Sequence, residues 1–161
     1  MSQLLIVYHS RTGGSRQMAE AAFAGAQPEI TTRILKAETA GPDDLLAAHG
    51  YIFCAPENLA ALSGVMKNFF DRCYYPVLGQ IEGRPYAQMI CAGSDGQNAA
   101  RQTARIATGW RLREVQAPLI ICTHAQTPEA ILAEKTIPQE ALSDCHDLGA
   151  AMGAGIGMGA F

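Results

Sequence analysis

The sequence predicts an α/β protein in which a five-stranded parallel sheet lies between two layers of helices, a three-layer αβα sandwich. Short apolar runs alternate with longer stretches of helical periodicity, which is typical of βαβ units. The predicted strands are 4–8, 30–35, 51–55, 86–92 and 117–122. A length of 161 residues fits the roughly 100 to 200 residues of one domain, so we expect a single domain over 1–161.

The patterning of these runs predicts their order in the sheet. Residues 4–7 and 51–54 are almost wholly apolar, as strands covered by helices on both faces are. Polar and apolar residues are mixed in 30–35, which is typical of a strand at the margin of a sheet. A central first strand beside an edge second strand predicts the order 2-1-3-4-5.

Capping signals and periodicity predict a helix after each strand. The expected helices run from Ser15, as the cap, to about Ala26, from Asp43 or Asp44 to Ala48, from 63 to 75, from near Gln97 to about Trp110, and from Pro138 towards the C-terminus. The glycines of GAGIGMG at 153–159 lack the strand and helix that a dinucleotide fingerprint needs. We interpret them as a helix face that approaches the sheet closely.

Charge and hydropathy exclude several classes of partner. The net charge is −3 and no cluster of Lys and Arg would attract phosphate backbones, so we expect no nucleic-acid partner. The apolar start at Leu4–Val7 lacks the basic segment of an export signal, and no run approaches the roughly 20 apolar residues that span a bilayer. A cytoplasmic protein with no membrane partner is expected.

The cysteines predict free thiols and no metal site. Cys54, Cys73, Cys91, Cys122 and Cys145 include no CxxC pair and no Cys and His cluster at metal spacing. Three of them, at 54, 91 and 122, fall at strand ends. Core packing is the favoured interpretation there, and a redox role is the alternative.

The segment YHSRTGGSRQMAEA at 8–21 predicts an anion site, because a buried strand breaks into a hydroxyl- and glycine-rich loop that opens directly into a helix. Hydroxyls of Ser10, Thr12 and Ser15 and helix-start N–H groups can converge on one phosphate, while Gly13 and Gly14 allow close approach. On spacing alone, a tight turn with a serine cap explains the loop equally well.

Three other phosphate sites do not match these residues. A Walker loop needs a GxxxxGK motif, and no such lysine is present. A cysteine phosphatase needs a thiolate in the loop, but the first cysteine is Cys54. A receiver domain needs acidic residues after the first strand, which ends with Val7, Tyr8 and His9. A bound, unreactive phosphate monoester remains.

Three segments carry a resemblance to a known family. SRTGGS at 10–15 resembles the (S/T)xTGx(S/T) phosphate loop of the flavodoxin-like superfamily, which holds FMN. APENLAALSGVMKNFFDR at 55–72 is similar to the stretch after the third strand of NAD(P)H-dependent FMN and quinone reductases. CAGSDGQNAARQ at 91–102 resembles their loop after the fourth strand. The resemblance implies FMN as cofactor, with NAD(P)H as co-substrate.

The same resemblance implies site residues in three groups. The phosphate would be held by Ser10, Arg11, Thr12, Gly13, Gly14 and Ser15. The isoalloxazine ring would be lined by Pro56, Glu57, Asn58 and Leu59, and covered at its other margin by Gly93, Ser94, Asp95 and Gly96. Bound FMN accepts hydride itself, so the protein needs few catalytic side chains.

Missing aromatic residues favour a reductase over a carrier. Relatives often place an aromatic residue after Pro-Glu, but this chain has Asn58, Leu59 and Ala60, with no aromatic between Gly93 and Ala107. An open ring face would let NAD(P)H and then a quinone, a flavin or a similar small-molecule acceptor react in turn, by a ping-pong mechanism. A flavodoxin-type electron carrier is the alternative, and a binding or regulatory domain with weak or lost flavin affinity is a further one.

Several features have two interpretations. His9 and His124 are expected either to donate protons near the flavin or, more often, to form local hydrogen bonds. Helix 63–75 is apolar nearly all round, which is typical of a buried helix, and a second subunit would bury it. Because similar reductases commonly form dimers, we expect a homo-oligomer, a dimer or tetramer. Either 75–84 or 123–137 is a possible lid over the substrate.

Overall fold

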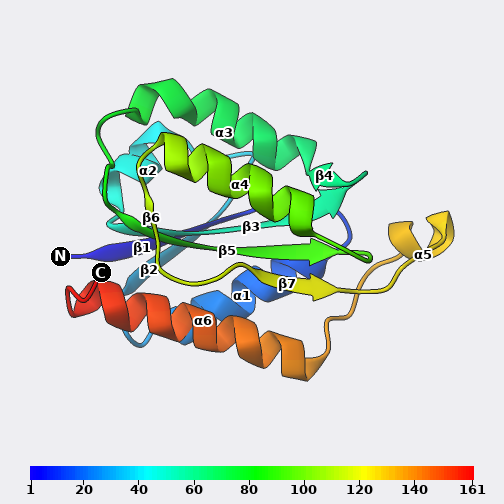
Figure 1. Ribbon diagram of the computed structural model, residues 1–161. Helices are drawn as coiled ribbons and strands as arrows, with labels where there is room; N and C mark the ends of the chain where they lie inside the picture. The colour runs from blue at the N-terminus through cyan, green and yellow to red at the C-terminus, as the bar shows by residue number, and fades with distance from the viewer.

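The computed structural model describes residues 1–161 and shows a parallel sheet with helices on both faces, which confirms the predicted three-layer fold (Figure 1). Neighbouring strands follow the order β2-β1-β3-β5, with β6 and β7 both pairing on β5. The strands are β1 (Gln3–Tyr8), β2 (Thr31–Lys36), β3 (Gly50–Asn58), β4 (Ala61–Leu62), β5 (Pro85–Ala92), β6 (Arg113–Glu114) and β7 (Leu119–Cys122). Only the short β4 is antiparallel to its neighbour.

The predicted order 2-1-3-4-5 is confirmed, with one addition at the margin. Residues 4–7 of β1 are fully buried, whereas β2 at the edge has no buried residue. The fifth position is shared, because β6 pairs with the start of β5 and β7 pairs with its end. Pro118, which has no N–H to donate, lies in the gap between them.

The helices form one layer on each side of the sheet (Figure 1). The helices α1 (Gly14–Ala26) and α6 (Gln139–Gly157) cover one face, while α2 (Pro42–Ala47), α3 (Gly64–Val77) and α4 (Gln97–Gly109) cover the other. A short α5 (Pro128–Leu132) lies beyond the carboxyl ends of the strands. All predicted helices are present within a few residues of their expected bounds.

The two faces of the sheet have different cores. Under α3 and α4, aromatic rings pack together: the Phe53 and Phe70 centroids lie 5.2 Å apart, and those of Phe70 and Trp110 5.7 Å apart. Under α1 and α6 the core consists of aliphatic, Met, Ala and Cys side chains. The apolar face of α3 is thus largely covered within the chain, and Tyr75 is left exposed.

Glycines let α1 and α6 touch through their backbones. A Cβ at Gly149 would lie 1.9 Å from the carbonyl oxygen of Ala22, and one at Gly25 would lie 2.0 Å from that of His146. Further along α6, Gly153 faces Ala26 and Glu29 of the α1 region. The expectation that the glycines at 153–159 approach the sheet was wrong: Gly153 faces the end of α1, Gly155 faces the Phe161 side chain, and Gly157 meets only the Glu29 carbonyl oxygen.

Segment 75–84 lies at the amino ends of the strands, far from α5 (Figure 1). Its Arg84 donates from Nη1 to the carbonyl oxygens of Leu45, Leu46 and Ala48 at 3.1, 3.0 and 2.6 Å. These bonds satisfy the free carbonyl groups at the carboxyl end of α2 and fix the position of the chain before β3. The alternative that made 75–84 a lid is therefore wrong, and only 123–137 lies at the opposite edge.

The cysteines and one surface ion pair complete the description of the fold. All five cysteines are free thiols, and no group of His, Cys, Asp and Glu side chains has the geometry to hold a metal ion. No helix has the length and apolar character needed to cross a membrane. Lys67 and Asp71 form an exposed i, i+4 ion pair at 2.7 Å on α3.

Adding one methyl group between α1 and α6 should destabilise the fold. We expect Gly149→Ala to lower the free energy of unfolding by about 1 to 3 kcal/mol, because the new Cβ overlaps the Ala22 carbonyl and the helices must separate. Gly157→Ala is the matched control. Its Cβ would meet only the Glu29 oxygen at 3.5 Å, so it should gain up to about 1 kcal/mol from helix propensity. Urea denaturation measures both, and equal stabilities would contradict the packing.

Candidate functional site

The loop after β1 leads into the first turn of α1. Gly13 is the N-cap of the helix, with a positive φ of 94° that glycine adopts readily. The Ser10 hydroxyl accepts a 3.0 Å hydrogen bond from the Gly13 N–H. The N–H groups of residues 14–16 have no intramolecular partner. The helix therefore begins with open donors at the edge of the sheet, an arrangement suited to an anion.

Ser15 is not the helix cap that the sequence predicted, because Gly13 takes that position. Ser15 lies in the first turn, only 2% exposed, and its hydroxyl is buried without a hydrogen-bond partner. A buried hydroxyl that lacks a partner destabilises a protein. With the Ser10 and Thr12 hydroxyls and the open N–H groups, this unsatisfied hydroxyl gives the loop the donor chemistry that a phosphate group needs.

The loop lies directly against the end of β5. A Cβ on Gly14 would be 2.6 Å from the sulfur of Cys91, so glycine is required for this approach. Burial raises the pKa of the Cys91 thiol to about 11, although the positive charge of Lys135 opposes part of the rise. The thiol is therefore protonated at neutral pH, and its role is to pack against the loop.

A second loop is the hairpin between β3 and β4. Asn58 pairs with Ala61, so Leu59 and Ala60 form a two-residue turn, with φ of 52° and 61°. Such turns favour Asn and Gly, and a non-glycine residue there is strained. The Leu59 side chain is 101% exposed. The chain therefore holds a large apolar side chain in solvent at a strained hairpin tip.

Side-chain hydrogen bonds fasten this hairpin to the start of α4. The Glu57 carboxylate accepts from the N–H groups of Gly96 and Ala99 at 2.9 and 3.1 Å, and so caps the helix from another strand. Asn98 donates to the Ala60 carbonyl at 2.7 Å. Glu57 thus positions the loop 93–96 relative to the hairpin.

The third part of the site is segment 123–137, which follows β7. His124 N–H donates to the Gly93 carbonyl at 2.7 Å, and Lys135 N–H donates to the Thr12 carbonyl at 2.8 Å. Between these two contacts the chain forms α5, whose first turn is capped by the Thr127 hydroxyl at 3.2 Å from Ala130 N. The segment therefore spans the site from loop 93–96 to the loop after β1.

These three parts surround a cleft of about 300 Å³, the central cleft, bordered by residues 11–12, 56–60, 91–94, Thr123, Ala125, Gln126, Ile131 and Lys135. It brings together eight of the predicted site residues: Arg11, Thr12, Pro56, Glu57, Asn58, Leu59, Gly93 and Ser94. Gly14 and Ser15 lie below the loop surface, and Asp95 and Gly96 lie beside α4 without lining the cleft. Loops distant in sequence therefore share one cavity.

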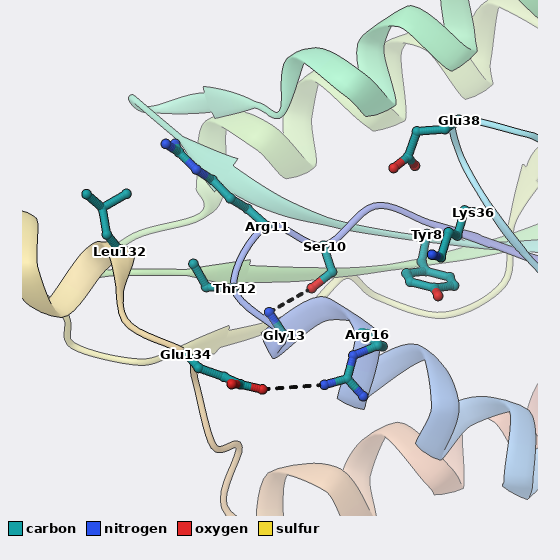
Figure 2. Close-up of a pocket in the computed structure, with 10 residues that line it drawn as sticks. All are labelled: Tyr8, Ser10, Arg11, Thr12, Gly13, Arg16, Lys36, Glu38, Leu132 and Glu134. Atoms are coloured by element: carbon teal, nitrogen blue, oxygen red, sulfur yellow. Dashed lines mark hydrogen bonds and ion pairs between the residues drawn. The ribbon is translucent and has the colours of Figure 1, made fainter.

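An outer pocket of about 410 Å³ lies on the other side of the same loop and is lined by Ser10 and Gly13 (Figure 2). In Figure 2, Arg11 extends away from Arg16, which points towards Glu134. Arg16 forms ion pairs with Glu134 at 3.9 Å and with Glu20 at 3.5 Å. Arg11 and Thr12 line both cavities, so the loop 10–13 separates them.

The two histidine candidates lie outside both cavities. His9 is half-buried, with its Nδ1 2.9 Å from the Ser63 hydroxyl, and burial lowers its pKa below the usual value. It is therefore neutral near pH 7 and engaged in a local hydrogen bond. His124 is exposed and has a positive φ of 61°.

Sequence reasoning missed Lys135 and Ile131, which also line the central cleft. Lys135 is separated from Thr12 by 123 positions in the chain, so no local motif joins them. The usable signal was the position of 123–137 after the last strand, because the carboxyl ends of parallel strands meet at one edge. That position predicts that the segment lies near the site, but it does not indicate which of its residues line the cleft.

Comparison with known proteins adds family information to this geometry. A model of the family of NADPH-dependent FMN reductases matches residues 39–127. A flavodoxin of Aquifex aeolicus is 34% identical over 60% of this chain and 53% of its own length. An NAD(P)H dehydrogenase (quinone) of Acidithiobacillus ferrooxidans is 35% identical over 45% of this chain and 47% of its own. The chain spans about half the length of these curated relatives.

Solved structures share the fold. A flavodoxin from the domain Archaea superposes with a TM-score of 0.77 at 16% identity, covering 96% of this chain and 98% of that one. A flavodoxin, WrbA-like protein from Agrobacterium tumefaciens gives 0.71 at 20% identity, covering 99% of both chains. At such low identities these matches establish the flavodoxin-like fold and nothing beyond it.

The family match contains the hairpin, loop 93–96 and most of the sheet, although the loop at 10–15 lies before it. Its residues 39–127 are more than half of the 161-residue chain. The chain belongs to the family of NADPH-dependent FMN reductases.

Proposed function

We propose that this chain binds FMN and uses NAD(P)H to reduce a flavin, a quinone or a similar planar acceptor. The observation that carries the proposal is that the open donors at the start of α1 adjoin the central cleft, with Thr12 at their junction. FMN has the matching shape, with a phosphate at one end and a planar ring at the other. Family membership implies the same cofactor and electron donor.

At the phosphate end, residues 10–15 would supply neutral donors. The hydroxyls of Ser10, Thr12 and Ser15 and the N–H groups of residues 14–16 are the candidates, and Gly13 and Gly14 keep the backbone accessible. Arg11 is exposed and would add positive charge. This end of the site recognises the phosphate and orients the rest of the cofactor.

At the ring end, residues 56–59 and 93–94 would line the two margins of the isoalloxazine, with Asp95 and Gly96 beside α4 outside the cleft. The bonds from Glu57 to Gly96 and Ala99 hold these loops at a fixed separation. Preorganised loops of this kind reduce the entropy lost when a planar group binds. Glu57 acts here as a positioning residue, because its carboxylate oxygens are already occupied by N–H groups.

The chemistry supplied by bound FMN is the acceptance of a hydride from NAD(P)H, which leaves as NAD(P)⁺, and the later delivery of two electrons to the acceptor. The chain contributes orientation and access. Leu59 and Ala60 stand where an aromatic residue would cover the ring, and a small or flexible side chain leaves room for a nicotinamide. Neither His9 nor His124 lines the cleft, so we assign no proton transfer to them.

A flavodoxin-type electron carrier is the second candidate, and it is supported by the 34% identity to the Aquifex aeolicus flavodoxin. Such a carrier would form a stable one-electron-reduced flavin and ignore NAD(P)H. A flavin-free binding domain is the third candidate and would be colourless. The absence of an aromatic residue at 58–61 and 93–98 favours the reductase over the carrier.

We further propose that the protein works in the cytoplasm as a homo-oligomer, a dimer or tetramer, on a small-molecule acceptor. Three exposed apolar side chains, Leu59, Ile131 and Leu132, surround the cavities and would be covered by a second copy. Light scattering of the FMN-loaded protein should give a multiple of the 17.1 kDa chain mass. A monomer mass would contradict this assembly.

An anaerobic spectrum separates the three candidate functions. FMN-loaded protein should be yellow, and added NADPH or NADH should bleach the flavin band without a stable one-electron intermediate spectrum. Added quinone should then restore the colour, because the second half-reaction removes both electrons. Protein that retains FMN but responds to neither nucleotide would overturn the reductase and leave the carrier.

The proposed contact between the loop at 10–15 and the phosphate can be tested by comparing FMN with riboflavin, which lacks the phosphate. Thr12→Val should weaken FMN binding about tenfold or more, because a charge-assisted hydrogen bond contributes about 1.5 to 3 kcal/mol. Riboflavin, which lacks the phosphate, should bind the variant and the original chain equally. Thr108→Val, an exposed change at the far end of α4, should alter neither affinity. Fluorescence titration measures all six constants, and equal weakening of both flavins by Thr12→Val would contradict a phosphate contact.

A further inference from the structure

A single ammonium group joins α5 to the loop after β1. The Nζ of Lys135 donates to the carbonyl oxygens of Ala130 and Ile131 at 2.9 and 2.8 Å, and also to that of Ala133. The same atom lies 3.4 Å from the Thr12 hydroxyl. Lys135 therefore closes the carboxyl end of α5 while its charge stands beside the residue that separates the two cavities.

The backbone around Lys135 is held against α1. The Gln17 amide donates to the Lys135 carbonyl at 2.6 Å and accepts from the Ile137 N–H at 2.9 Å. Ile137 is only 3% exposed and belongs to the core under α1. Because the backbone at Lys135 is held by these hydrogen bonds, the lysine side chain extends from a fixed position towards the loop.

The charge of Lys135 is not neutralised by any carboxylate. Of the nearby cations, Arg16 is paired with Glu20 and Glu134, whereas Lys135 takes part in no ion pair. A phosphate monoester carries about 1.5 to 2 negative charges at neutral pH. Within residues 10–15 the donors around Thr12 are neutral N–H and hydroxyl groups, apart from the guanidinium of Arg11. Arg11 is exposed and no side-chain hydrogen bond or ion pair holds it in place, whereas Lys135 is held beside Thr12.

We propose that Lys135 is a fixed cation that binds the phosphate of the flavin, supplied to the loop at 10–15 from a distant part of the chain. The inference rests on the proposed binding of FMN and assigns a ligand to that site. All three ammonium donors bond to carbonyl oxygens of residues 130–133, so one of them would exchange its carbonyl for a phosphate oxygen. The exchange is favourable because a charge-assisted bond to phosphate is roughly twice as strong as one to a neutral group. Lys135 thereby makes the chain select phosphorylated flavin over riboflavin.

The test compares FMN with riboflavin binding in the original chain and three variants. Lys135→Gln should weaken FMN binding about tenfold, while riboflavin affinity stays unchanged. Lys135→Arg keeps the charge and should retain most of the FMN affinity. Thr127→Val is the matched control, because it removes the cap at the other end of α5 and leaves the cation in place. It should affect both flavins equally or neither.

A second measurement does not depend on affinity or turnover. The ³¹P resonance of protein-bound FMN should differ between the original chain and Lys135→Gln, and Lys135→Arg should resemble the original chain. Equal weakening of both flavins by Lys135→Gln, or an unchanged FMN constant, would overturn the assignment and leave the lysine as a cap of α5. If the original chain binds neither flavin, the proposed function itself fails, which is a distinct result.

Discussion

The contact between Gly14 and Cys91 sets the geometry on which the site depends. It places the first turn of α1 directly against the end of β5, two strands away from the strand that precedes the loop. Any side chain at position 14 would push the loop outwards, because the sulfur would lie 2.6 Å from the new Cβ. The open N–H groups therefore lie at the middle of the sheet edge, where the loops after β3 and β5 also end.

Two side chains then fix the remaining loops to this reference point. Glu57 links the β3–β4 hairpin to α4, and Gln17 links the segment at 135–137 to α1. Both side chains bond to backbone groups of an element that is remote in sequence. Each therefore fixes the position of one loop relative to a helix more narrowly than packing alone would. The result is a rigid cleft with a solvent-exposed apolar tip at Leu59, which suits a cofactor held firmly at one end and approached by substrates at the other.

Local patterns predicted the strands, their order and the helices because burial at 4–7 and partial exposure at 31–36 are direct consequences of position in the sheet. The predictions that were wrong concerned residues whose positions depend on contacts elsewhere in the chain. Ser15 has the chemistry of a cap, but Gly13 takes that position with a positive φ. The glycines of α6 do mark close approaches, yet only the structure shows their partners, such as Ala22 for Gly149 and Phe161 for Gly155. Lys135 reaches Thr12 through long-range folding and leaves no local signature.

The turn at Leu59 and Ala60 also has a consequence for protein engineering. Asn-Gly at these positions would relieve the positive φ strain and remove an exposed apolar side chain, so a design aimed at thermal stability would begin there. The same exchange would remove the one large side chain that the hairpin presents to the central cleft. A variant chosen by melting temperature alone would therefore lose part of the apolar lining of the cleft, because the strained turn and the cleft wall share the same two residues.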